Sequence, residues 1–256
     1  SSGPGTGMGA EDFAASLGID KVSAFKSMFY LYAVLGVLSA LLYRRLPHAQ
    51  AEEKVPSAPL GPSRGVVYKL AALFSLDAFA GGFVVQSLLA LWLFERFDLS
   101  LAAASVFFFW SSTFSAFSYP VAAWLASRIG LVNTMVYTHI PSSVFLIMAA
   151  FSPNVYVALA LLLLRSALSQ MDVPTRTSYV MAVVTPSERP TAASVTAVPR
   201  SLASAISPAL AGFLLASAIP GLPLIVCGVL KIAYDVALLF SFRHIKPPEE
   251  VRSAPH

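Results

Sequence analysis

Residues 222–242 read LPLIVCGVLKIAYDVALLFSF, and this stretch decides the class of fold. Only Lys231 and Asp235 are charged in a run that is otherwise almost entirely apolar. A helix of about 20 apolar residues spans the roughly 30 Å hydrocarbon core of a bilayer. Because lipid offers no hydrogen-bond partner, the backbone groups must be satisfied within the segment itself. The stretch is therefore predicted to be a transmembrane helix.

The rest of the chain repeats this pattern. Of the 256 residues, 57% are hydrophobic and 12% are charged, whereas about a quarter of the residues in a soluble domain are charged. Membrane β-strands are excluded, because they would be about 10 residues long and would alternate polar with apolar residues. The fold class is an all-α membrane protein. Its other predicted spans are roughly 25–43, 70–94, 101–127, 132–151, 155–184 and 191–218.

Only one connection between the predicted helices is long. Residues 44–68 are polar, Pro-rich and charged with both signs, which is typical of a mobile linker. Ten Lys and Arg residues lie on the side of this linker and three on the other side, so the positive-inside rule places the linker and the C-terminus in the cytoplasm. The predicted organisation is an extracytoplasmic segment 1–24, a transmembrane helix 25–43, a linker 44–68, a six-helix bundle 69–243 and a cytoplasmic tail 244–256.

Two of the predicted spans share a sequence pattern. SAFSYP at 115–120 is followed by LASRIG at 125–130, and SAISP at 204–208 is followed by LASAI at 215–219. A separation of about three spans is expected from two inverted three-helix repeats in one half of a transporter. The alternative is chance similarity, because Ala, Ser and Leu dominate both stretches.

Ionisable side chains inside the spans are the most informative residues. Each costs at least ~2.5–3.5 kcal/mol at the centre of an isolated helix, so they are expected to pair or to face a wet cavity. Asp172 and Arg176 are four residues apart and can form an ion pair. The carboxylate can serve as a protonation site for proton coupling, or the pair can be structural and hold helices together near the cytoplasmic mouth. Arg165 lies two turns before Asp172, on the same side of a continuous helix, and suits an anionic substrate or a carboxylate partner. Pro174 removes a helix hydrogen bond, so a bend is expected there.

Other spans carry further candidates. Asp77 precedes Gly81-Gly82, with Gln86 a turn later. Its carboxylate can accept from Arg165 or Arg200 across the bundle, titrate during transport, or serve only in helix packing. Arg200 follows Pro199 among small residues and is expected to face a cavity.

Two simpler interpretations concern the remaining polar groups. Lys231 and Asp235 are four residues apart on the last helix, so they are predicted to neutralise each other. His139 is interpreted as a histidine at a helix interface, with a proton relay as the alternative.

No catalytic, cofactor or metal motif is present in the sequence. It has no Ser-His-Asp grouping, no Gly-rich phosphate loop and no cluster of metal ligands, and its single cysteine, Cys227, lies in an apolar block. The chain is therefore predicted not to be an enzyme and to need no cofactor. Its basic residues are spread out rather than clustered, which argues against a nucleic-acid partner.

Three stretches resemble the major facilitator superfamily of transporters. The run from Arg165 through DVPTR at 172–176 and TPSERPTA at 185–192 resembles the tenth helix, a cytoplasmic loop and the eleventh helix, and SPALAG at 207–212 extends the likeness. ASRIG at 126–130 is similar to the loop motif between the eighth and ninth helices. That motif often has Asp before its Arg and basic residues after its Gly, and this chain departs from it at both places.

The resemblance covers about residues 25–245. It implies the six-helix C-terminal half of a major facilitator fold preceded by one extra transmembrane helix, the family's sixth. It also implies solute transport by alternating access. Arg165 and Arg200 inside the spans separately favour an anionic solute with protons as coupling ions. The first five helices are absent, so the chain is interpreted as a fragment whose partners are the bilayer and a missing N-terminal half. The implied substrate-binding or coupling candidates are Asp77, Gln86, Arg165, Asp172, Arg176 and Arg200.

Two alternatives stay open at this point. A non-transporting receptor or scaffold can be built on the same fold. A seven-helix retinal protein with a Schiff base on Lys231 is a remote alternative. The middle helix of such proteins usually has an Arg-Tyr start and aspartates, which residues 101–127 lack, and a linker as long as 44–68 is not expected in them. In either case the chain is an integral, multi-pass protein, expected in a plasma or inner membrane.

Overall fold

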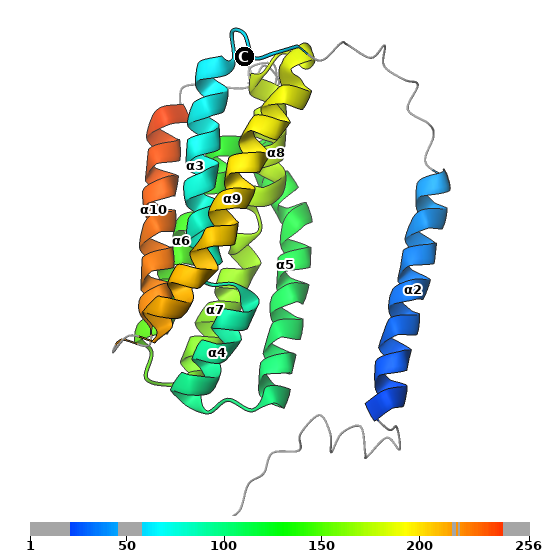
Figure 1. Cartoon of the computed structure of the whole chain (residues 1–256), viewed down its shortest axis with the longest axis vertical. Coiled ribbons are helices and arrows are strands. Elements are labelled where there is room, and N and C mark those ends of the chain that lie inside the picture. The colour runs from blue at the N-terminus through cyan, green and yellow to red at the C-terminus, as the bar shows by residue number, and fades with distance from the viewer. Residues whose placement is uncertain (1–20, 46–57, 217–218, 220, 243–256) are drawn as a thin grey trace, which may run out of the picture. The chain divides into compact units, whose positions relative to one another are not determined.

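The computed structural model describes residues 21–45, 58–216, 219 and 221–242 (Figure 1). It divides into two compact units, one with residues 1–55 and 100–105 and the other with residues 56–99 and 106–256. Each unit is described by itself. The predicted extracytoplasmic segment, most of the predicted linker and the cytoplasmic tail lie outside the described residues.

The first unit contains helix α2, Lys21–Arg45. It confirms a helix over the first predicted span, 25–43. The side chains described in its middle are large, apolar and exposed, among them Phe29, Tyr32 and Leu38. Arg44 and Arg45 close its last turn, as expected at a cytoplasmic membrane boundary. Its crossing of a bilayer stays a prediction.

Six helical segments are long and apolar enough to cross a membrane, and all of them lie in the second unit apart from residues 101–105. The six predicted spans of the bundle are thereby confirmed as helical. Two of the six segments are each made of two helices. The elements are α3 Arg64–Gly82 with α4 Gln86–Phe97, α5 Leu101–Ile129, α6 Leu131–Phe151, α7 Val155–Ser169 with α8 Asp172–Val183, η1 Pro186–Glu188 with α9 Arg189–Leu215, and α10 Leu222–Phe242.

The break between α7 and α8 has a cause in the sequence. Proline has no N–H, and its ring clashes with the carbonyl four residues earlier. For Pro174 that carbonyl belongs to Gln170, and the helix is interrupted at Gln170 and Met171. The predicted bend is therefore present, one turn before the proline, with α8 starting anew at Asp172.

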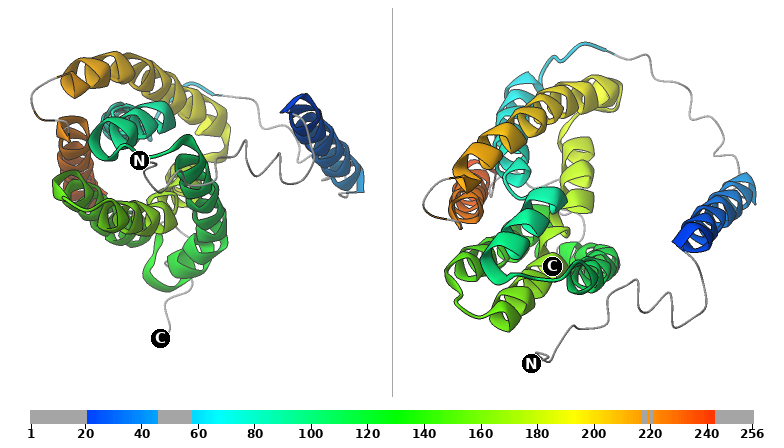
Figure 2. Two further views of the ribbon diagram at one scale, coloured as in Figure 1. Left: turned by 90° about the horizontal axis from the view of Figure 1, so that it is seen from below. Right: turned by 60° about the horizontal axis from the view of Figure 1, so that its bottom comes forward.

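The break between α3 and α4, at residues 83–85, coincides with close packing of α3 on α9. A Cβ atom added to Gly82 would lie 1.8 Å from Oγ of Ser207 and 3.0 Å from its Cβ. Only glycine allows this approach. α9 packs along α3, and the right-hand view of Figure 2 shows the two helices next to each other.

Two apolar clusters hold the bundle together, one toward each end. Phe74 of α3 belongs to one cluster, and Phe83, directly after the end of α3, belongs to the other. On α10, Leu238 belongs to the first cluster and Cys227 to the second. On α6 the same change occurs between Val136 and Leu146. Ionisable side chains occupy the layer between the two clusters, near the middle of each helix.

The start of α3 is tied to the start of α9 at one end of the bundle (Figure 1). Glu188 accepts hydrogen bonds from the backbone N–H of Gly61 at 2.5 Å, from Ser63 at 2.7 Å and from Thr185 at 2.7 Å. Residues 58–63 are therefore held against the loop between α8 and α9. Residues up to 68 were predicted to belong to the linker, whereas α3 begins at Arg64.

Candidate functional site

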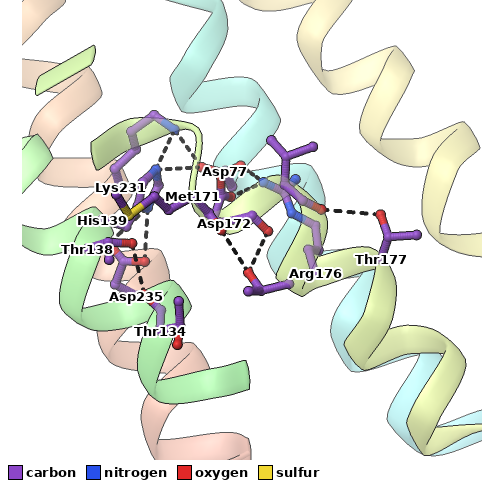
Figure 3. Close-up of polar contacts among 12 residues, drawn as sticks. Asp77, Thr134, Thr138, His139, Met171, Asp172, Arg176, Thr177, Lys231 and Asp235 are labelled. Atoms are coloured by element: carbon purple, nitrogen blue, oxygen red, sulfur yellow. Dashed lines mark hydrogen bonds and ion pairs between the residues drawn. The ribbon is translucent and has the colours of Figure 1, made fainter. Parts of the chain in front are cut away.

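Asp77 is the centre of a buried charge cluster, which we define as Asp77, His139, Asp172, Arg176, Lys231 and Asp235 (Figure 3). Its Oδ1 accepts a hydrogen bond from Nζ of Lys231 at 2.6 Å, and its Oδ2 lies 3.2 Å from Nη2 of Arg176. Asp77 is only 4% exposed. One carboxylate from α3 is thus shared by a cation from α8 and a cation from α10.

His139 connects this centre to a second carboxylate. Its Nδ1 lies 3.0 Å from Oδ1 of Asp235, and its Nε2 lies 3.2 Å from Nζ of Lys231 and 3.8 Å from Oδ1 of Asp77. His139 is 1% exposed and Asp235 is 0% exposed. The imidazole therefore bridges α10 and α3 inside the polar layer, and its edge packs against the ring of Tyr234.

Arg176 is paired at one end of its guanidinium only. Its Nη2 bonds Asp172 as well as Asp77, which confirms the ion pair predicted between residues 172 and 176. Its Cζ lies 5.2 Å from the centre of the Phe74 ring, a cation–π arrangement. Nη1 and Nε are buried without a hydrogen-bond partner among the described residues. An unpaired buried donor is costly, so Arg176 retains capacity for a further acceptor.

A cavity of about 370 Å³ borders the cluster. The exposed guanidinium of Arg200 lines it together with Ser201 and Ser204 of α9. Gly81 and Gly82 of α3 also line it. The residues of the charge cluster that line it are Asp77, Asp172, Arg176 and Lys231.

A second cavity of about 380 Å³ lies between α4, α5 and α7. Arg165 lines it with Gln86 and the hydroxyl side chains Ser111, Ser112, Ser115 and Tyr119. Among the described residues, the guanidinium of Arg165 has no hydrogen-bond or ion-pair partner. We call these the Arg200 cavity and the Arg165 cavity. Gln170, at the break between α7 and α8, borders both of them.

The structure thus divides the predicted site residues between two places. Asp77, Asp172, Arg176 and Arg200 line the Arg200 cavity. Gln86 and Arg165 line the Arg165 cavity. The expected alignment of Arg165 with Asp172 is wrong, because the helix is broken between them and they belong to α7 and α8.

Two predicted pairings differ in the structure. Asp77 is paired with Arg176 and Lys231, rather than with Arg165 or Arg200. The predicted pair between Lys231 and Asp235 is wrong. Although the two lie one turn apart on α10, each finds a partner on another helix, because the elements that pack against α10 present Asp77 and His139.

The candidate set drawn from the sequence omitted His139, Lys231 and Asp235. A signal for them was present, since all three are polar side chains in the middle of predicted spans, where each is costly without a partner. Lys231 and Asp235 are four residues apart, so they were predicted to pair with each other. Their contacts with Asp77 and His139 on other helices were therefore not predicted.

Asp77, His139 and Asp172 also offer ligand atoms within 4.8 Å of one another. This spacing suits a metal ion geometrically. However, Lys231 and Arg176 bond the same carboxylates, and a divalent cation would have to displace both positive groups. The arrangement is better suited to a charge network that exchanges partners or protons.

The comparisons with known proteins agree with this architecture. Residues 70–256 match the sequence profile of the Major Facilitator Superfamily. No curated protein and no solved structure matches the chain. The match favours a transporter over a seven-helix retinal protein, and Lys231 is engaged with Asp77 rather than free for a Schiff base. With most of the chain covered by this match and six membrane-length helical segments, the protein belongs to the major facilitator superfamily and is a multi-pass membrane transporter.

Proposed function

We propose that the protein moves a small solute across the membrane by alternating access, driven by protons, and that this chain works as the C-terminal half of a longer transporter. The missing N-terminal half would form the other wall of the central pathway. We place the C-terminus in the cytoplasm and the protein in a plasma or inner membrane.

One observation carries the proposal: a buried network of acids, bases and a histidine lies between the two apolar clusters of the bundle and borders a cavity. Charged side chains in the middle of a membrane are expensive and typically serve transport pathways or proton relays. If the charged side chains only held helices together, two separate ion pairs would be sufficient. Here one carboxylate is shared by two cations, and an imidazole extends the network to a further carboxylate.

The spare positive groups favour an anionic solute. Arg200 and Arg165 each line a cavity without an ion-pair partner among the described residues. Arg176 keeps two unpaired N–H-bearing nitrogens, Nη1 and Nε. Planar guanidinium groups match carboxylates and phosphates with two parallel hydrogen bonds. Small carboxylates are therefore the first solutes to test.

The test is uptake by the full-length transporter in proteoliposomes, with a panel of radiolabelled carboxylates and an imposed proton gradient. Arg165→Ala and Arg200→Gln are each expected to lower uptake by at least tenfold while the amount of protein in the membrane holds. Arg96→Gln is the matched control, because Arg96 is exposed at the end of α4 and lines neither cavity.

The outcomes separate the proposal from its alternative. If both cavity variants transport as well as Arg96→Gln, the arginines do not bind the solute. If no solute in a broad panel moves, whatever its charge, the protein is a receptor or scaffold on the same fold.

A further inference from the structure

The partners of His139 determine which of its nitrogens carries the proton. A carboxylate only accepts hydrogen bonds, so Nδ1 must donate its N–H to Asp235. A lysine ammonium only donates, so Nε2 must offer its lone pair to Lys231. With Asp235 ionised and Lys231 charged, these contacts fit a neutral His139 whose basic nitrogen faces Lys231.

The groups around the Arg200 cavity are balanced in this state. Three carboxylates, Asp77, Asp172 and Asp235, oppose three cations, Arg176, Lys231 and Arg200. These are the charged groups that face His139 or the cavity from α3, α8, α9 and α10. The remaining neighbour, α7, directs Arg165 into the other cavity. A proton added to His139 therefore leaves one positive charge uncompensated.

Protonation of His139 would also break one contact. An N–H at Nε2 would face the ammonium of Lys231 across 3.2 Å, and the two like charges repel. Oδ1 of Asp77 lies 3.8 Å from Nε2 and can accept from it instead. Lys231 lines the cavity as well, so rotation of its flexible side chain can direct the ammonium into the cavity without movement of α10.

We propose that His139 binds the coupling proton and that its protonation turns the Arg200 cavity into a site for one monovalent anion. The proton comes from water in the cavity and ends on Nε2. The displaced Lys231, together with Arg200 and the unpaired nitrogens of Arg176, then faces the anion. The proton and the anion bind together because their opposite charges neutralise each other, and a net charge is costly in a medium of low dielectric. The inference rests on the proposed transport function and names its proton site.

A charge-sensitive labelling experiment tests this without knowledge of the solute. Ser201 is exposed on the wall of the Arg200 cavity. In the full-length transporter in nanodiscs, Ser201→Cys is treated with an anionic sulfonatoethyl or a cationic trimethylammonioethyl methanethiosulfonate. Both reagents react with the same thiolate, so the ratio of their reaction rates does not depend on how much of the thiol is ionised. Native Cys227 is buried, so protein without the Ser201 substitution supplies the background.

As the pH falls from about 8 to about 5, the range in which a histidine titrates, the anionic-to-cationic rate ratio is expected to rise about tenfold. The rise should disappear when His139→Gln is added. Ser112→Cys, on the wall of the Arg165 cavity, is the matched control and should show no such rise.

The other outcomes overturn the inference. A rise that persists in His139→Gln assigns the proton to a carboxylate. A ratio that does not change with pH shows that the cavity gains no charge. Either result leaves the proposed transport function standing, because that function is judged separately by the uptake of solutes and its loss in the cavity variants.

Discussion

At the scale of single residues, Asp77 is the group on which the other charges depend. It is buried, and it is the acceptor shared by Lys231 and Arg176. Arg176 retains Asp172 if Asp77 is lost, but Lys231 would keep only a neutral imidazole nitrogen. A buried cation without a counter-charge costs far more than the ion pair contributes.

Asp77→Asn is therefore expected to lower the free energy of unfolding by about 3–5 kcal/mol. The measurement is denaturant-induced unfolding of the protein in mixed micelles. Asp98→Asn is the control, since Asp98 is exposed and its left-handed conformation, φ 50°, is well tolerated by Asn.

A double variant tests whether the loss of stability comes from leaving Lys231 without its counter-charge. Asp77→Asn combined with Lys231→Met changes both members of the pair between Lys231 and Asp77 and should recover part of the lost stability. If the double variant is less stable than Asp77→Asn by the full cost of a second independent substitution, the two side chains are not coupled.

Residue-level reasoning from the sequence succeeded where a contact is local and failed where it is not. The pair of Asp172 and Arg176 lies on one helix turn and was predicted correctly. Lys231 and Asp235 have the same spacing but bond Asp77 and His139. Spacing shows which side chains can meet, whereas the neighbouring helices decide which of them do meet.

At the scale of the elements, the broken helices shape the site. The break between α7 and α8 places Gln170 on both cavities and separates Arg165 from Asp172. The break after α3 exposes Gln86 at the start of α4. The predicted spans lie close to the observed helical segments. However, residues 70–94 were predicted as one continuous helix, because hydropathy does not reveal where the backbone of an apolar segment bends.

The contact between α3 and α9 depends on the absence of a side chain at residue 82. Gly82→Ala would place a methyl group against Ser207, and we expect a loss of about 1–3 kcal/mol of stability, the usual cost of overpacking. Thermal unfolding in detergent measures the loss.

The same helix offers a matched control for that substitution. A Cβ at Gly65 would meet no atom within 4 Å, so Gly65→Ala should leave the stability of the protein nearly unchanged. Adding Ser207→Ala to Gly82→Ala removes the closest atom and should restore part of the stability. Equal effects of the two glycine substitutions would contradict the tight packing of α3 on α9.

At the scale of the whole molecule, the orientation in the membrane stays a prediction that rests on the basic residues. The bundle must place the loop between α8 and α9 on one side and the loop between α6 and α7 on the other, because α7 and α8 together form a single membrane-length segment. The positive-inside rule assigns the former loop, which contains Arg189, to the cytoplasm.

Single cysteines test this orientation. Ser187→Cys should react with a membrane-impermeant maleimide only after the cytoplasmic face is opened, whereas Pro153→Cys should react in intact cells. Pro153 is exposed in the loop that precedes α7. The reverse pattern would invert the predicted topology, and equal labelling from the outside would contradict the crossing itself.

The amino-acid sequence by itself determined that the chain lies in a membrane, how many membrane-length helical segments the bundle has and approximately where each of them lies. These properties follow from hydropathy and from the backbone's need for internal hydrogen bonds, which act along a single segment. Most of the ionisable groups of the site were also recognisable, because any charge in such a segment is unusual.

Only the tertiary structure decided how those groups are joined. Residues 77, 139, 176 and 231 come from four helices, and no local spacing relates them. Their partners depend on which faces the helices present to one another, and that is set by close contacts such as Gly82 against Ser207 and by the break before Pro174. A buried charge must find a counter-charge in space, wherever the fold brings one within reach.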